Sequence, residues 1–354
     1  MRERISQLDA IRGVAILLVL AHNTQGNYPD LSLGILSSDG WMGVDLFFVL
    51  SGFLITGILL RTRESEKYFR NFYARRCLRI WPLYYSVLLF MFVLVPLLRP
   101  SERVEIFAPR SSPWWAYPLF AQNFLVSVPT KATGLLGVTW SLAVEEQFYL
   151  AWPWIVRFCS NAQLRFIAIA VVCASPVLRL FLSLNGFNIY SPTYCRLDGL
   201  MAGALLALFL NSPGFNPTNF TRAAWAGVLA GTPLALLLEA LGARWIVFSF
   251  TVIASTCFIY LALFSTKSWL RVVLTNRYLV YTGAISYGLY LLHKIPFDAA
   301  KALHITRLQG RRYELLVMLG GLAASYALAA LSWNLLEKPF LKLKRFYPSD
   351  VRIN

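Results

Sequence analysis

The sequence predicts an all-α protein, a polytopic transmembrane helix bundle of about ten spanning helices. Of its 354 residues, 57% are hydrophobic and 14% charged, whereas a soluble globular domain carries roughly 25% charged residues. Apolar runs close to the ~20 residues needed to cross a bilayer recur along the whole length. We therefore expect one membrane domain over residues 1–340 and a short basic cytoplasmic tail over residues 341–354.

The expected spanning helices lie between polar or Pro/Gly-rich breaks in the apolar pattern. The N-terminal stretch has the basic start of a signal peptide, but Arg12 interrupts it and no A-x-A cleavage site follows, so it is expected to stay as the first helix. The segment 99–137 has only a short apolar run among prolines and is expected to be interfacial or re-entrant. The helices are expected at residues 8–24, 41–60, 80–98, 138–156, 166–184, 196–211, 222–241, 244–264, 279–295 and 314–336.

Basic residues between these helices predict the orientation of the bundle. With the N-terminus inside, the cytoplasmic segments hold about twice as many lysines and arginines as the outer segments, so both termini are expected in the cytoplasm. The net charge of +16 is spread over short segments instead of one tract. This distribution favours lipid headgroups over nucleic acid as the partner of the basic residues.

The five cysteines form no CxxC pair and lie mostly inside apolar segments. Neither a disulfide framework nor a zinc or other metal site is therefore indicated.

Several ionisable residues interrupt the apolar segments. A charge at the bilayer centre costs at least ~2.5 kcal/mol on insertion scales, so each one needs a partner or a function. For Arg179 and Glu239 taken singly we expect helix–helix ion pairs or interfacial positions. Taken together, the residues indicate a polar cavity in the bundle. They are Arg12, His22, Asp45, Glu145, Glu146, Arg179, Arg196, Asp198 and His293.

His22 and His293 stand apart because histidine titrates near neutrality and can act as a general base. Both are expected near the outer ends of their helices. Ser286, Tyr290 and His293 follow the spacing i, i+4 and i+7, so they share one helix face. Lining of a cavity and hydrogen bonding at the interface both remain open for His293.

A basic run covers Arg70–Arg79 on the expected cytoplasmic side. Positive-inside anchoring accounts for such a run, and so does binding of a phosphate-bearing cytosolic donor, because guanidinium groups suit bidentate phosphate contacts. Both interpretations stay open on the residues alone.

Seven short motifs follow one another along the chain, and in this order they resemble the acyltransferase-3 family of membrane acyltransferases. The motifs lie within residues 8–22, 43–56, 72–85, 140–150, 196–198, 286–293 and 337–340. Members of this family are ten-helix inner-membrane proteins that transfer acetyl or other acyl groups from cytosolic acyl-CoA to carbohydrates and related acceptors. Because the chain ends soon after Pro339, we expect the membrane unit alone, without the esterase-like domain that some members carry.

The resemblance implies an O-acyltransferase of the bacterial cytoplasmic (inner) membrane. Acyl-CoA, above all acetyl-CoA, is the expected co-substrate, with no permanently bound cofactor. A carbohydrate or lipid-linked glycan is the expected acceptor. The identity of the acceptor, the acyl chain and the oligomeric state are left open.

Site residues follow from the family's motifs, position by position. The motifs imply catalytic roles for Arg12, His22, Asp45, Glu145 and Glu146, donor binding by Arg75, Arg76 and Arg79, and a cavity with Arg196, Asp198, Tyr290 and His293. In the mechanism that fits these positions, His22 is the base or takes the acyl group briefly, and Asp45 orients it. Arg12 or a tyrosine stabilises the oxyanion.

One spacing departs from the family pattern. This chain has nine residues between Arg12 and His22 where the family usually has ten, which turns His22 by about 80° away from Arg12 on a regular helix. We therefore expect the first helix to end or distort within Leu18–Ala21, helped by Asn23, Thr24 and Gly26.

Two other classes of function remain alternatives. A transporter or flippase of a polysaccharide export system also needs buried charges and a polar path. A non-catalytic subunit of such a system is the third possibility. Binding or hydrolysis of acetyl-CoA discriminates between them, because a permease needs no CoA site.

Overall fold

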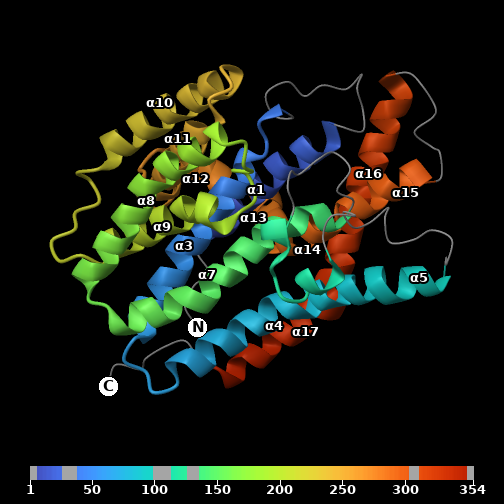
Figure 1. The fold of residues 1–354 in the computed structure, drawn as a ribbon, viewed down its shortest axis with the longest axis horizontal. Coiled ribbons are helices and arrows are strands. Elements are labelled where there is room, and N and C mark those ends of the chain that lie inside the picture. The colour runs from blue at the N-terminus through green and yellow to red at the C-terminus, as the bar shows by residue number, and fades with distance from the viewer. Residues whose placement is uncertain (1–5, 26–37, 99–112, 126–134, 303–310, 349–354) are drawn as a thin grey trace. The chain divides into compact units, whose positions relative to one another are not determined.

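A computed structural model describes residues 6–25, 38–98, 113–125, 135–302 and 311–348, and within these ranges the chain forms helices and no strand (Figure 1). The predicted all-α class is confirmed. In the described ranges, seven helical stretches are long and apolar enough to cross a membrane, so the chain is a multi-pass membrane protein. They are Met42–Thr62, Tyr68–Leu97, Asn161–Leu184, Thr193–Leu210, Thr221–Ala240, Arg244–Phe264 and Arg312–Phe346. The total of about ten spans and the location of the termini remain predictions.

Three of the ten expected spans are not among these seven stretches. Helices α1 (Ser6–Gln25) and α7 (Thr139–Phe158) are continuous over 20 residues but carry more polar side chains. The single helix expected at 279–295 is instead divided into α13 (Arg277–Ala284), α14 (Ser286–Leu292) and α15 (Lys294–Ala302). Pro296 explains the second break, because it has no N–H to donate to the preceding turn.

The described residues form two compact units that interleave along the sequence. Unit 1 comprises Met1–Leu17, Trp41–Glu64 and Val144–Ala284, and unit 2 comprises Leu18–Gly40, Ser65–Ala143 and Ile285–Asn354. Helices α1 and α7 therefore contribute to both units. The single domain expected over residues 1–340 remains a prediction.

Unit 1 contains the longest apolar helices, and these pack in pairs. Its helix α9 packs against both α3 and α8, and α10 packs along α11 (Figure 1). A capping box at Ser160 and Gln163 starts α8, because each side chain satisfies the other residue's backbone N–H. The helices are α3 (Met42–Thr62), α8 (Asn161–Leu184), α9 (Thr193–Leu210), α10 (Thr221–Ala240), α11 (Arg244–Phe264) and α12 (Ser268–Leu274).

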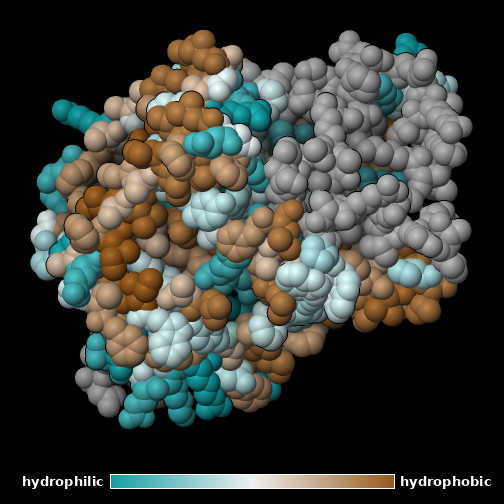
Figure 2. Space-filling model, viewed as in Figure 1, coloured by the Kyte–Doolittle hydropathy of each residue, from teal (hydrophilic) through white to brown (hydrophobic). Residues whose placement is uncertain are grey.

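Exposed apolar side chains cover the outward faces of α8 and α10. Phe166 and Leu184 on α8 are 74% and 78% exposed, and Leu229 on α10 is also exposed. Figure 2 shows these faces as brown patches. Large apolar side chains pointing outward from long helices are typical of contact with lipid.

Unit 2 is built around two long helical rods. The first joins α4 (Tyr68–Leu89), the π-helical segment η1 (Phe90–Leu94) and α5 (Val95–Leu98). The second joins α16 (Arg311–Ser332), the π-helical segment η6 (Trp333–Glu337), α17 (Lys338–Lys342) and η7 (Leu343–Phe346). Helix α17 packs against α4, and α14 and α15 pack against α16 (Figure 1).

Short helices occupy the described parts of the region between α5 and α7. They are η3 (Trp114–Ala116), α6 (Gln122–Leu125) and η4 (Leu135–Val138). The side-chain amide of Gln122 donates to the backbone carbonyl of Thr139 at 3.0 Å, and Tyr84 donates to the carbonyl of Tyr117 at 2.8 Å. These bonds tie the region to α4 and α7, while its interfacial or re-entrant placement remains a prediction and its other residues lie outside the described ranges.

Candidate active site

Helix α1 is regular through His22, so the predicted distortion at Leu18–Ala21 is wrong. The helix continues to Gln25, and Gly26 lies outside the described residues. Asn23 and Thr24 do not terminate it, because their side chains donate to the carbonyls of Val19 and Ala21, both at 3.0 Å, in the preceding turn. Such bonds are compatible with a continuing helix.

Arg12 has a local partner on the same helix. Its guanidinium donates to Asp9 at 2.8 Å, and its side chain is 21% exposed. His22 is half-buried. On a regular helix an offset of ten residues places the two side chains about 80° apart and about 15 Å along the axis. The geometry of α1 therefore gives Arg12 and His22 different directions.

Asp45 belongs to a buried network in unit 1. One of its carboxylate oxygens accepts a hydrogen bond from the guanidinium of Arg196 on α9, and the other accepts one from the hydroxyl of Thr251 on α11. All three side chains are almost completely buried. Both oxygens of Asp45 are thus occupied by partners other than His22, whose orientation was the role suggested for this residue.

A second buried ion pair adjoins the first on helix α9. Arg179 on α8 donates to Asp198 at 2.7 Å, and also to the carbonyl of Cys195 at 2.8 Å and to the hydroxyl of Ser249 at 2.7 Å. The ion pair expected for Arg179 is therefore confirmed. The pair expected for Glu239 is also present, with Arg244 at 2.7 Å near a helix end.

Aromatic rings surround the Arg196 guanidinium. Its central carbon lies 3.9 Å from the ring centroid of Phe248 and 5.7 Å from those of Phe48 and Tyr190. Burial raises the pKa of Tyr190, in the loop between α8 and α9, to about 12, so its ring stays neutral beside the cation. Cation–π contacts offset part of the cost of keeping Arg196 away from water.

The two glutamates on α7 have different surroundings. Glu145 accepts hydrogen bonds from Ser51 of α3 at 2.6 Å and from Tyr149, one turn along α7, at 3.1 Å. Its neighbour Glu146 is half-buried. One turn further along, the indole of Trp152 donates to Thr56 at 2.8 Å, so polar contacts connect α7 with α3 over two turns.

The basic run occupies the first three turns of α4, in unit 2. Arg75 donates to the backbone carbonyls of Lys344 at 3.3 Å and Tyr347 at 2.8 Å, so it anchors the C-terminal segment. The guanidinium of Arg76 lies 5.9 Å from the ring centroid of Phe72. Arg79 is close enough to the buried carboxylate of Glu337 to interact with it electrostatically.

Tyr290 and His293 lie at the end of α14, also in unit 2. Tyr290 donates to the carbonyl of Val138 at 2.8 Å, and its hydroxyl is 2.5 Å from that of Ser141. His293 is completely buried, and its Nδ1 lies 2.8 Å from the carbonyl of Tyr290 and 3.1 Å from that of Leu289. Carbonyls only accept, so Nδ1 carries the proton and Nε2 is the basic nitrogen.

Nε2 of His293 has no hydrogen-bond partner among the described residues. A buried nitrogen without a partner costs about 1–3 kcal/mol, so such an atom calls for a functional or solvent partner. This observation keeps His293 in the set of candidate bases.

The structure brings some of the predicted site residues together and reveals partners that the sequence did not single out. In unit 1 it joins Asp45, Arg196 and Asp198, and it adds Ser51 and Thr251 as partners of acidic residues. Ser51 lies within the motif at residues 43–56, which was a usable signal, whereas Thr251 lies in none of the motifs and no sequence signal marks it. In unit 2 it adds the buried Glu337, which accepts from Ser332 at 3.1 Å. Its place in the motif at residues 337–340 was a usable signal.

The sequence model of the acyltransferase domain of the acyltransferase-3 family matches residues 5–333. This match covers nearly the whole chain, so the chain belongs to this family of acyl-transferring enzymes. The family resemblance inferred from the motifs is confirmed.

Curated relatives are named as O-acetyltransferases. The chain is 29% identical to the peptidoglycan O-acetyltransferase OatA of Listeria monocytogenes over 161 residues, which cover 43% of this chain and 24% of that protein. It is 28% identical over 365 residues to a protein of Staphylococcus aureus named as a candidate O-acetyltransferase, covering 96% of this chain and 57% of the relative. The chain thus spans little more than half the length of these relatives at most. No solved structure matches.

Proposed function

We propose that this enzyme transfers an acyl group, above all acetyl, from acyl-CoA to a hydroxyl of a carbohydrate or lipid-linked glycan at the bacterial cytoplasmic membrane. The observation that carries the proposal is the family match over residues 5–333 together with relatives named for O-acetylation, one of them for acetylation of peptidoglycan. A multi-pass bundle with buried ionisable groups is a suitable setting for such a transfer.

Donor binding is proposed for the first turns of α4. Arg75, Arg76 and Arg79 lie within two helical turns of one another, and guanidinium groups bind phosphates through paired hydrogen bonds. Arg75 also anchors two carbonyls of the C-terminal segment, so we propose Arg75, Arg76 and Arg79 together for the phosphates of CoA.

His22 is proposed as the general base. The hydroxyl oxygen of the acceptor attacks the thioester carbonyl, the imidazole takes the hydroxyl proton, and the carbon–sulfur bond breaks to release CoA, whose thiolate recovers the proton. His22 is half-buried, whereas the His293 side chain is completely buried. Accessibility to substrate therefore favours His22, and His293 is the second candidate because its basic Nε2 is unpartnered.

The test uses the purified full chain in vesicles with acetyl-CoA and glycan acceptors, with release of the CoA thiol and O-acetyl ester formation as readouts. We expect His22→Ala to abolish both while membrane insertion stays normal. His293→Ala, assayed in parallel, should keep substantial transfer. Loss confined to the His293 variant would move the base to His293, and glycan translocation without thiol release by the wild type would overturn the transferase proposal.

A further inference from the structure

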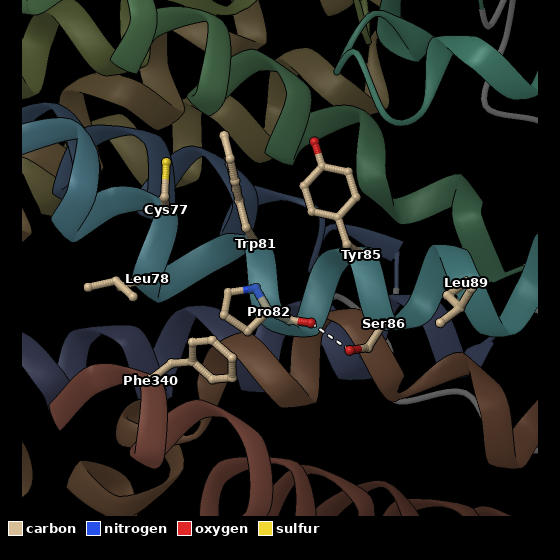
Figure 3. A pocket seen from close by; sticks show the side chains of 8 residues that line it. All are labelled: Cys77, Leu78, Trp81, Pro82, Tyr85, Ser86, Leu89 and Phe340. Carbon is tan, nitrogen blue, oxygen red and sulfur yellow. Dashed lines mark hydrogen bonds between the residues drawn. The ribbon is translucent and has the colours of Figure 1, made fainter. Parts of the chain in front are cut away.

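A groove of about 420 Å³ opens along one face of α4, within unit 2. Figure 3 shows the ring of Phe340, from α17, beside Pro82 and Leu78 of α4. Phe340, Trp81 and Leu89 are between 39% and 56% exposed, so the groove is open to the surroundings of the protein. It is lined by Cys77, Leu78, Trp81, Pro82, Tyr85, Ser86, Leu89 and Phe340.

The groove offers few hydrogen-bonding groups to a ligand. The hydroxyl of Ser86 donates to the carbonyl of Pro82 at 2.7 Å, and that of Tyr85 donates to the carbonyl of Pro118 at 3.0 Å. The amides of a pantetheine arm would lose their hydrogen bonds to water here, which costs free energy. A hydrocarbon chain has no such requirement.

The length of the groove fits one leaflet of a bilayer. From Cys77 to Leu89 the helix rises by about 18 Å at 1.5 Å per residue. Half of the hydrocarbon core measures about 15 Å. A single acyl chain lying along α4 would therefore be covered over most of its length.

Positive charge gathers where α4 begins. Residues 67–79 hold five lysines and arginines, residues 338–348 hold four, and neither stretch contains an acidic residue. The C-terminal segment is held beside α4, because Asn71 donates to the carbonyl of Pro348 at 2.8 Å and Arg75 to those of Lys344 and Tyr347. Phe340, in the wall of the groove, precedes the exposed Lys342 and Arg345 by only a few residues.

The space-filling view shows hydrophilic residues at this end. A hydrophilic, teal band lies at the lower edge of Figure 2, where α4 begins and α17 ends in Figure 1. The apolar groove therefore has a cluster of cationic residues at one end.

We propose that this groove is a binding site for an anionic phospholipid. One acyl chain lies against Trp81, Leu89 and Phe340, and the phosphate of the headgroup lies among the cations that include Lys342 and Arg345. Clusters of lysine and arginine on the cytoplasmic side of spanning helices attract anionic headgroups, and aromatic side chains favour the membrane interface. The headgroup is assigned to Lys342 and Arg345, and not to Arg75, Arg76 and Arg79, which are proposed for the phosphates of CoA.

The contribution of the cationic residues to lipid binding is tested by titrating the full chain in neutral detergent with spin-labelled phosphatidylglycerol and, separately, with spin-labelled phosphatidylcholine. For the wild type we expect tight, salt-sensitive binding of phosphatidylglycerol and at least tenfold weaker binding of phosphatidylcholine. The double variant K342Q/R345Q should lose about tenfold or more in affinity for phosphatidylglycerol. The matched control K267Q/R271Q removes one exposed lysine and one exposed arginine of unit 1 and should bind like the wild type.

The role of the groove in lipid binding is tested with the variant Ser86→Trp, because Ser86 is exposed and a larger side chain there fills the groove. The control is Cys173→Trp, at an exposed position on α8. We expect only Ser86→Trp to weaken binding of phosphatidylglycerol. Equal binding of the two lipids by the wild type would overturn the headgroup assignment. Equal loss in both charge variants, or unchanged binding by Ser86→Trp, would overturn the site.

Discussion

At the residue scale, the buried charges of unit 1 pair with one another. Asp45 with Arg196, and Asp198 with Arg179, place two cations and two anions within α3, α8 and α9. Removing one partner of such a pair leaves an unpaired buried charge, which costs more than the pair itself contributes. The network therefore makes the packing of these helices sensitive to single substitutions.

Asp198→Asn should destabilise the protein strongly. Arg179 keeps its charge in a buried position but loses its anionic partner, and the expected loss is about 3–5 kcal/mol. Denaturant unfolding in detergent, followed by tryptophan fluorescence, measures it. The control is Glu239→Gln, because its partner Arg244 is 67% exposed and such pairs contribute about 1 kcal/mol or less. Equal stability of the two variants would contradict the structural role of Asp198.

Arg75→Ala and Arg76→Ala should have different effects. Arg76→Ala should raise the KM for acyl-CoA, with a loss that deepens as salt screens the remaining phosphate contacts. Arg75→Ala should also free the C-terminal segment, because two backbone carbonyls lose their donor. Limited proteolysis of that segment and acyl-CoA kinetics measure the two effects. An unchanged acyl-CoA KM in both variants would place the donor site elsewhere.

At the element scale, close contact between α3 and α9 depends on two glycines. A Cβ at Gly52 would overlap the carbonyl oxygen of Leu200, and one at Gly203 would overlap that of Val49. Small residues at crossings let helix backbones approach in membranes. The same approach brings Asp45 of α3 to Arg196 of α9.

Gly203→Ala should therefore push α3 and α9 apart and lower both stability and transfer. The matched control is Gly320→Ala on α16, where an added Cβ meets no atom within 4 Å. There the change should be neutral or stabilising by up to about 1 kcal/mol, because alanine favours a helix over glycine. Thermal unfolding of both variants in detergent measures the difference, and equal melting temperatures would be inconsistent with a close crossing.

Whole-molecule orientation follows from the distribution of basic residues. The excess of lysine and arginine in alternate segments predicts that both termini lie in the cytoplasm. A fusion of green fluorescent protein to the C-terminus should fluoresce, and a fusion of alkaline phosphatase at the same position should be inactive, since each reporter works on only one side of the membrane. Active phosphatase at that position would reverse the orientation.

In helix α1, two residues that favour the end of a helix did not end it. Asn23 and Thr24 favour the end of a helix, yet their side chains bond to carbonyls of the preceding turn and the helix continues. Likewise, the apolar composition of residues 279–295 predicted one helix, whereas the helix is interrupted at Ile285 and His293. Apolar composition alone does not reveal such single-residue interruptions.

The sequence by itself determined the class of this protein: an all-helical membrane protein of the acyltransferase-3 family. Backbone groups in lipid must be hydrogen-bonded internally, so long apolar runs become helices whatever their neighbours, and the motifs indicate the family. Only the tertiary structure decided the partners of the charged residues. Asp45 meets Arg196 and Thr251, which lie more than 150 positions away along the chain, because helix packing brings them together. Spacing within one helix carries no information about which other helices it will meet.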